Sequence, residues 1–408
     1  MIVRNLFRPR AAAPLTPAVF PEYSISSGGM AINSGKRVTP ETAKSLATAY
    51  RCGNILSDDI AQMPLQVFRK NGRTIEQVAP DGMMRNLAYL LEVQPNRRTT
   101  PFILKKTLVQ WLLYWGNAYV WQPAQARELY VLMADRTWPA FDLDGNLWYQ
   151  TLFPDGSLET LPAVEVAHVM INSTDGVEGR SVLTYACETM GRQLGAHETQ
   201  DRIQGNGLNP AAVLWVNGDI NSEARSKLKA TYTREIGGSE NGGGLAVFDN
   251  KIVKFEPVSL KPVDAQFLES IQATDVDIAN FFGMPLYKLN QGKQSYESNS
   301  QQDLDYIKTT LNPYLVQIEQ EARLKWLSRA EQGNTYLRFI REALLQTDAK
   351  TRSEYLERQV LSGQMTPNEA RQVNDMSAYP GGDGHYIPAN MALVGADGAL
   401  QTGGTPNA

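Results

Sequence analysis

Two long helical patterns with a small insertion between them constrain the architecture of this chain most strongly. The first covers residues 181–207, and a helix of roughly 25 residues would be about 37 Å long at 1.5 Å per residue. The second covers residues 261–287 and ends at Gly283 and Pro285. Helices of this length are rods more than core elements. The sequence therefore predicts two rods.

Each rod carries a stripe of residues at helical spacing. The first stripe is apolar at its start and polar at its end, and the second lies on one face of its helix. The first consists of Leu183, Cys187, Met190, Leu194, His197 and Asp201, and the second of Phe267, Ile271, Ile278 and Phe281.

The insertion, residues 208–260, has the pattern of a small β-α-β-β unit. It contains a strand-like run, AAVLWV, then the helical run SEARSKLKATYTREI, then two more strand-like runs, LAVFD and KIVKFEPV. The glycine-rich turn GGSENGGG at 237–244 does not match G-x-G-x-x-G and joins a helix to a strand. We interpret it as a flexible turn.

Residues 39–180 have the pattern of an α+β unit with small antiparallel sheets. Thr39-Pro40 and Thr100-Pro101 each combine a capping threonine with a first-turn proline and predict helix starts. Asn71-Gly72 predicts a hairpin. Asp144-Gly145 and Asp155-Gly156 separate further strands. The first helix is expected to continue to Met63 with four apolar positions, Leu46, Tyr50, Leu56 and Ile60.

The remaining segments are a helix and strand at 300–346 and two flanking tails. Pro313 lies inside the helical pattern and predicts a kink near Asn312. Residues 347–408 contain a capping box from Thr366 to Glu369 and end in a Gly- and Pro-rich stretch expected to be loop and loose tail. Residues 1–38 predict a flexible basic arm.

The stretch NQGKQSYESNSQQ at 290–302 lies between two helical patterns, yet it holds no aliphatic residue and almost no net charge. Such a segment cannot build a core. It is either a plain connector or a segment that must stay exposed for a function. Lys293 is balanced by Glu297 within it.

Charge and cysteine content exclude several protein classes. The 408 residues carry a formal net charge of −4, so the whole chain is not an electrostatic trap for nucleic acid. Cys52 and Cys187 lie in apolar helical patterns and predict buried, reduced thiols. The N-terminus lacks an uninterrupted apolar run, and the apolar segment 107–121 is too short for a bilayer, so we expect no membrane association.

A search for catalytic motifs gives no positive result. The three histidines, His168, His197 and His385, have no metal-ligand spacing and are expected to be structural or exposed. The segment GMAINSGKR at 29–37 has the wrong glycine spacing for a phosphate loop. Two acidic pairs, Asp58-Asp59 and Asp303 with Asp305, are expected to face solvent. We therefore predict no catalytic residue, no metal and no cofactor.

Six segments in a fixed order carry a resemblance to a known family. They are AYRCGNILSDDIAQMPLQVF, QPNRRTTPF with LLYWGNAYVW, GRSVLTYACETMG, DAQFLESIQATDVDIANFFGMP, TLNPYLVQIEQE, and SGQMTPNEAR with the later GGD. The chain resembles the HK97-like portal proteins of tailed bacteriophages from Thr39 to about Met391. It departs at Ser181-Val182, where many relatives have a proline, which leaves the details of that junction open.

The resemblance implies a ring-forming α+β portal architecture. Residues 39–180, with 300–346 returning to them, would be the wing, and 181–207 and 261–287 the two stem helices. Residues 208–260 would be the clip, 288–299 a tunnel loop that narrows the channel, and 347–408 the crown helices and tail.

The resemblance also implies the function and its sites. The ring would be a dodecamer at one capsid vertex, through which double-stranded DNA is packaged and ejected. The expected partners are the terminase large subunit, the major capsid protein and a head-tail adaptor, in a virion assembled in the host cytoplasm. Expected DNA-facing residues of the tunnel loop are Lys288, Asn290, Gln291, Lys293, Gln294, Ser295 and Tyr296. Expected clip residues for oligomerisation and terminase docking are Val213, Leu214, Trp215, Val247 and Phe248.

Two other readings differ in what they require. A terminase-like enzyme would need a phosphate loop or a carboxylate metal cluster, and neither pattern is found. A head-tail connector, or another structural ring without a packaging role, would need no chemistry either. The length and the two-rod layout favour a portal over a connector.

Overall fold

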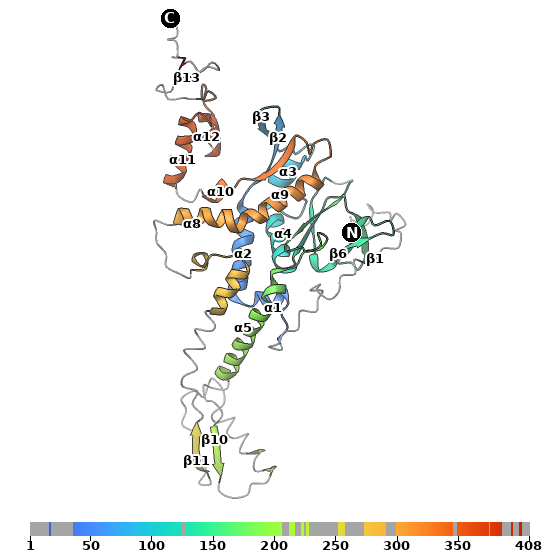
Figure 1. Ribbon diagram of the computed structural model, residues 1–408, viewed down its shortest axis with the longest axis vertical. Helices are drawn as coiled ribbons and strands as arrows, with labels where there is room; N and C mark the ends of the chain where they lie inside the picture. The colour runs from blue at the N-terminus through green and yellow to red at the C-terminus, as the bar shows by residue number, and fades with distance from the viewer. Residues whose placement is uncertain are drawn as a thin grey trace. The chain divides into compact units, whose positions relative to one another are not determined.

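The computed structural model describes residues 16–17, 36–124, 127–205, 212–216, 222–223, 226–227, 252–257, 273–290, 299–345, 349–374, 376–385, 393–394 and 400–401. The chain divides into two compact units, Met1–Phe339 and Ile340–Ala408. Figure 1 shows the order of helices and strands along the chain. Among the described residues, no helix combines the length and the apolarity that a membrane crossing requires.

The first unit is built on the helices α2 (Ala47–Gln62) and α4 (Pro101–Trp115), which pack face to face. The Tyr114 hydroxyl donates a hydrogen bond of 3.1 Å to the Ala49 carbonyl. Gly53 gives the Tyr114 ring its space, because a Cβ at residue 53 would lie 2.2 Å from the Tyr114 hydroxyl oxygen. The predicted start of α4 at Thr100-Pro101 is confirmed.

The predicted first helix is wrong in one respect, because it is two helices. α1 (Pro40–Lys44) has the expected Thr39 cap, but the chain leaves the helix before α2 begins. The Ser45 hydroxyl donates a bond of 2.7 Å to the Thr42 carbonyl and competes with the helical backbone pattern. Tyr50, predicted on the apolar face, is 54% exposed.

Two antiparallel sheets flank these helices. The first has the order β12-β2-β3, and its predicted hairpin turns at Gly72 with a φ of 63°. The second has the order β5-β4-β9. α3 (Leu87–Glu92) precedes α4 in the chain. The strands are β2 (Leu65–Asn71), β3 (Thr74–Gln77), β12 (Thr335–Phe339), β4 (Asn117–Trp121), β5 (Tyr130–Leu132) and β9 (Val166–Met170).

A third antiparallel sheet, in the order β1-β6-β7-β8, includes a piece of the N-terminal arm. β1 (Thr16–Pro17) pairs with Phe141 and Ala140, so this part of the arm, expected to be flexible, is a strand. A 3-10 turn, Ala134–Arg136, directly precedes β6. The turns predicted at Gly145 and Gly156 are confirmed by positive φ angles. The strands are β6 (Thr137–Phe141), β7 (Leu147–Leu152) and β8 (Leu158–Pro162).

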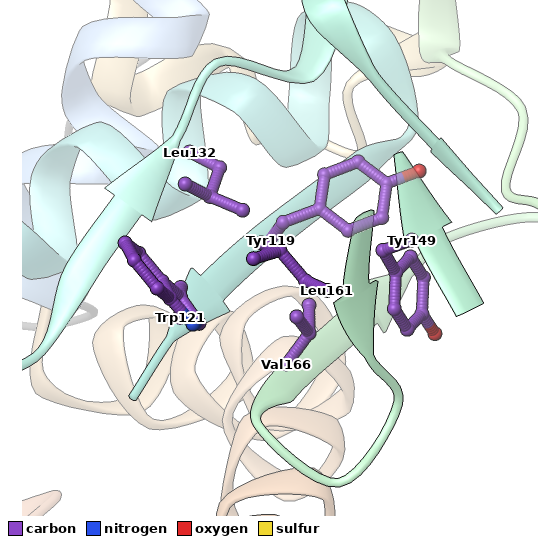
Figure 2. Close-up of a cluster of buried hydrophobic side chains, with 6 residues drawn as sticks. All are labelled: Tyr119, Trp121, Leu132, Tyr149, Leu161 and Val166. Atoms are coloured by element: carbon purple, nitrogen blue, oxygen red, sulfur yellow. The ribbon is translucent and has the colours of Figure 1, made fainter. Parts of the chain in front are cut away.

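Aromatic side chains join the second and third sheets in one core cluster (Figure 2). The Tyr119 and Tyr149 rings meet edge to face with centroids 5.6 Å apart. His168, on β9, stacks on Tyr119 and is 4% exposed. The predicted structural role of His168 is confirmed by this burial. The other cluster members are Trp121, Leu132, Leu161 and Val166.

A pair of glycines forms the junction between α4, β4 and the first rod. Gly116 ends α4 with a φ of 81°. Gly179 lies against it, and Asn117 bonds both backbone groups of Gly179, donating to its carbonyl at 2.9 Å and accepting from its N–H at 2.7 Å. Two segments that carry the family resemblance therefore meet in space.

The first rod is α5 (Val182–Gly205), which begins directly after this junction. Ser181 is buried, and its hydroxyl accepts a bond of 3.2 Å from the Thr184 N–H. Val182 thus occupies the first helical position, which proline favours, and the Ser181 hydroxyl caps the helix in this chain. The predicted burial of Cys187 is confirmed, and Leu183 and Met190, at the apolar start of the same stripe, are buried too.

The second rod is described only at its end, as a helix over residues 273–281. Phe267 and Ile271 lie outside the described residues. Ile278 is buried, but Phe281, which the sequence pattern placed on the same face, is exposed, and Phe282 is buried in its place. The Phe282 ring meets Tyr114 edge to face at 6.2 Å, so contact with α4 sets the buried face.

The helix predicted after residue 300 consists of α8 (Asn299–Tyr306), a π-helical turn (Ile307–Leu311) and α9 (Asn312–Trp326). The irregularity lies just before Pro313, where a kink was predicted, and the Asn312 N–H bonds to the Ile307 carbonyl. α9 then joins two sheets. The carboxylates of Glu319 and Glu321 accept bonds from the backbone N–H groups of Phe339 and His168.

In the insertion, β10 (Ala212–Val216) and β11 (Ile252–Pro257) form an antiparallel pair. The second unit contains α10 (Glu342–Leu345), α11 (Ala349–Leu361) and α12 (Pro367–Val373), and the predicted capping box at Thr366 is confirmed. The predicted loose tail contains one short ladder, β13 (Leu393–Val394) with β14 (Leu400–Gln401).

Candidate functional site

The polar segment predicted to enter a channel is described at its two flanks, and both flanks contact α2. On α2, Thr48, Arg51 and Asp59 recur at spacings of three and eight residues, which places them on one side of the helix. Each of these side chains bonds to a different segment of the second half of the chain. α2 therefore serves as the platform of the site.

The N-terminal flank runs from the helix 273–281 to Asn290. Gly283 breaks the helix with a φ of 63°, and a 3-10 turn, η4 (Leu286–Leu289), follows. Asn290 has a left-handed φ of 58°, which asparagine tolerates better than most residues. Arg51 donates a bond of 3.1 Å to the Lys288 carbonyl and so fixes η4 to α2.

Asp275, in the helix that precedes η4, fixes the same flank to α2. Its carboxylate accepts bonds from the Thr48 hydroxyl at 2.6 Å and from the Gln193 amide at 2.8 Å. These donors lie on α2 and α5. One carboxylate thus joins both predicted rods to the platform.

The C-terminal flank is α8, and its last residue reaches back to α2. The Tyr306 hydroxyl donates a bond of 2.9 Å to the Asp59 carboxylate. Tyr306 is 2% exposed, so this charge-assisted bond is shielded from water.

The two flanks also bind each other. The Lys288 ammonium lies 3.1 Å from the Asp303 carboxylate and 4.8 Å from the centre of the Tyr306 ring. The Tyr287 hydroxyl lies within hydrogen-bond distance of the Gln302 carbonyl and of the Asp303 carboxylate, at 3.0 and 3.2 Å. The residues just before and just after segment 291–298 are therefore bonded to each other.

Burial shifts the pKa values of Asp59 and Tyr306, the two side chains that join α8 to α2. Burial raises the pKa of the Asp59 carboxyl, while the Tyr306 hydroxyl and the Lys288 ammonium act to lower that pKa. Burial and the Asp59 charge raise the pKa of Tyr306, which keeps its hydroxyl protonated as a donor. The two residues thus form a stable donor and acceptor pair.

Of the residues predicted to face DNA, the structure describes two. Lys288 lies in η4 before the segment, and its ammonium is engaged by Asp303 and Tyr306. Asn290 follows η4 and is exposed. The other predicted residues lie outside the described part of the chain: Gln291, Lys293, Gln294, Ser295 and Tyr296.

Of the residues predicted for subunit contacts, three lie on β10. Val213, Leu214 and Trp215 pair with Glu256, Phe255 and Lys254 of β11. Val247 and Phe248 lie outside the described residues.

The prediction that both acidic pairs face solvent is wrong for three of the four carboxylates. Asp58, Asp59 and Asp303 are half-buried, and only Asp305 is exposed. Asp58 forms an ion pair of 2.5 Å with Lys106. One signal in the sequence could have shown this for α8, because Tyr306 follows Asp303 by three residues and shares its helix face.

Metal binding and thiol chemistry find no support in the described residues. No group of three His, Cys, Asp or Glu side chains there could hold a metal ion. Cys52 and Cys187 are buried and free, as predicted, and burial raises the pKa of the Cys52 thiol to about 12.

Comparisons with known proteins point to one family. The family model described as phage portal protein matches residues 47–375. The chain is 25% identical to the probable portal protein of Streptomyces phage phiC31, over 95% of this chain and 86% of that protein. It is 23% identical to the portal protein of Enterobacteria phage HK97, over 86% and 84%.

A solved structure shares the fold. A chain in the neck of a native gene transfer agent particle, computed with C12 symmetry, superposes with a TM-score of 0.53. The identity is 19%, over 83% of this chain and 92% of that chain. At this identity the likeness concerns the fold alone.

Proposed function

This chain belongs to the phage portal protein family, and on that premise we propose that twelve copies form a ring whose central channel carries double-stranded DNA. The observation that supports the number is the shared fold with a chain whose particle neck was computed with C12 symmetry. A cyclic ring needs one heterologous contact, repeated until the rotation closes. In this proposal the ring lies at one vertex of the capsid of a phage or a phage-derived particle.

The proposed parts of the subunit follow the order of its elements. Residues 39–180 and 300–346 form the wing, α5 and the helix ending at residue 281 form the stem, residues 208–260 form the clip, and 347–408 form the crown. The buried start of α5 and its half-buried residues 194–198 support a helix that leaves a core and continues as a stem.

The proposed channel must let a polyanion pass without holding it. Each phosphate that a protein neutralises adds a salt-dependent contribution to DNA affinity, and several such contacts together change affinity by orders of magnitude. A chain with a net charge of −4, in which the Lys288 ammonium is already paired with Asp303, suits a conduit.

We also propose the partners that packaging and ejection require. These are the terminase large subunit during packaging, the head-tail adaptor afterwards, and the major capsid protein around the ring, all in a virion assembled in the host cytoplasm. The subunit itself would supply structure and no catalysis. The alternative is a head-tail connector ring without a packaging role.

Electron microscopy of the purified protein tests the ring and the clip contact together. We expect wild-type protein to show rings with a central hole and the Val213→Lys variant to show severalfold fewer. Val213 is paired with Glu256 in the register of β10 and β11. A lysine there is opposite a carboxylate, which favours the strand pair, but it places a charge on an edge that must join a neighbour.

Val164→Lys is the matched control, because Val164 is 72% exposed in a turn of the first unit. It should form rings like the wild type. Wild-type protein that stays monomeric would contradict the ring, and a Val213→Lys variant that assembles normally would contradict only the clip contact.

Packaging assays test the polar segment itself. We expect Lys293→Ala and Tyr296→Ala to leave rings intact and to reduce the DNA packaged or retained per particle severalfold, because a cation and an aromatic ring are the side chains there best suited to a passing phosphate or base. Asn299→Ala, at the start of α8, is the control. Normal packaging by both variants would leave the segment a plain connector.

A further inference from the structure

Five side chains make one connected set at the base of segment 291–298. We call this set the loop-base cluster, and it consists of Arg51, Asp59, Lys288, Asp303 and Tyr306. Arg51 holds the N-terminal flank to α2 at 3.1 Å, and Asp59 holds the C-terminal flank to α2 at 2.9 Å. The ion pair between Lys288 and Asp303 closes the flanks on each other at 3.1 Å.

The partial burial of the cluster makes these contacts stronger than ordinary surface pairs. The side chains of Lys288 and Asp303 are 28% and 37% exposed, and the Lys288 ammonium also lies over the shielded Tyr306 ring. Exposed ion pairs contribute little because water and salt screen them, whereas screening weakens with burial. A charged hydrogen bond such as the one between Tyr306 and Asp59 is about twice as strong as a neutral one.

The composition of the cluster argues for more than core packing. Apolar side chains would fill the same space, but hydrogen-bonded charges also fix a single geometry. Two cations and two carboxylates balance, so the base adds no net charge beside the segment. Charge balance of this kind suits the base of a loop that must not hold DNA.

We propose that the five residues of the loop-base cluster are positioning residues, which anchor both ends of segment 291–298 to α2 so that its base stays fixed while DNA passes. This inference rests on the proposed channel function. α2 packs on α4 along its buried face, so a force on the segment would be transmitted to the core of the first unit.

Hydrogen exchange of the full-length protein, in its purified assembly state, tests the anchor. The Lys288 and Asn290 amides bond to the carbonyls of Pro285 and Tyr287, so their exchange reports the opening of η4. We expect Tyr306→Phe, Asp303→Asn and Lys288→Met each to speed exchange in peptides 284–290 and 302–307 on the order of tenfold, the effect of losing one charged hydrogen bond. Exchange in α4 should not change.

Three further variants distinguish a local loss of the anchor from a general destabilisation of the protein. Lys288→Arg keeps the cation and should restore wild-type exchange. Tyr314→Phe on α9 and Asp277→Asn on the exposed side of the helix 273–281 repeat the same chemical changes away from the cluster, and both should exchange like the wild type.

The outcomes distinguish this inference from the channel proposal. Wild-type exchange of both peptides in Tyr306→Phe and Asp303→Asn overturns the anchor, and so does equal acceleration in α4. Faster exchange at the base alone supports it. Normal packaging by the Lys293 and Tyr296 variants would instead remove the role in DNA passage, while the exchange result at the base would stand.

Discussion

Gly179→Ala should lower the free energy of unfolding by about 4 kcal/mol or more, an effect at the upper end for a single substitution. A Cβ at residue 179 would lie 2.1 Å from the Gly116 carbonyl oxygen and 2.9 Å from the Ile171 carbonyl oxygen. Neither neighbour is the end of a flexible side chain, so the backbone itself would have to move. That movement would also break the two hydrogen bonds between Asn117 and Gly179.

Urea denaturation followed by tryptophan fluorescence measures this effect, and Gly333→Ala is its control. A Cβ at residue 333 meets nothing within 4 Å, so that variant should stay within about 1 kcal/mol of the wild type. Gly116→Ala should resemble Gly179→Ala, since a Cβ there would lie 2.4 Å from the Arg180 carbonyl carbon. A Gly179→Ala variant as stable as Gly333→Ala would mean that the junction can relax.

This junction also shows what the sequence could and could not predict about the fold. The bounds of α4 were predictable because both signals are local: a threonine cap with proline at its start and a glycine at its end. The contact across the junction was not predictable, because Asn117 and Gly179 are 62 residues apart. A glycine required by tertiary contact has the same sequence signature as one in a turn.

The candidate site was also predictable only in part. Composition alone marked residues 290–302 as a segment that cannot enter a core. Its anchors were missed, because Tyr306 and Asp59 are 247 residues apart, and an acidic pair on an amphipathic helix gave no sign of a buried partner. Lys288 was predicted to face DNA, since the sequence does not show that Asp303 engages it.

His168 should make the first unit sensitive to acid. Its Nδ1 lies 3.2 Å from the Tyr149 hydroxyl, and its Nε2 lies 2.9 Å from the Asn117 Oδ1 atom. Oδ1 can only accept, so Nε2 carries the proton and Nδ1 accepts from Tyr149, which is the neutral form of the ring. Burial, and to a smaller extent the charge of Lys325, lower the pKa of His168 from 6.5 to about 3.

The sign of the pH dependence follows from these two values. Below pH 6.5 the unfolded chain gains a proton on this residue that the native state does not bind until about pH 3. Stability is therefore present above pH 6.5 and falls as the pH is lowered. At pH 4.5, two units below the unfolded value, the expected loss from this residue is about 2.7 kcal/mol.

Comparing urea unfolding of wild type and His168→Gln at pH 7 and pH 4.5 isolates this contribution. The variant should be less stable at pH 7, because glutamine cannot reproduce both ring contacts, but its stability should fall by about 2.7 kcal/mol less between the two pH values. The Glu321 carboxyl, whose pKa burial raises, acts in the opposite direction in both proteins. His385→Gln, at an exposed position, should keep the full wild-type slope. Equal slopes for wild type and His168→Gln would show that the native state accepts the proton at this site.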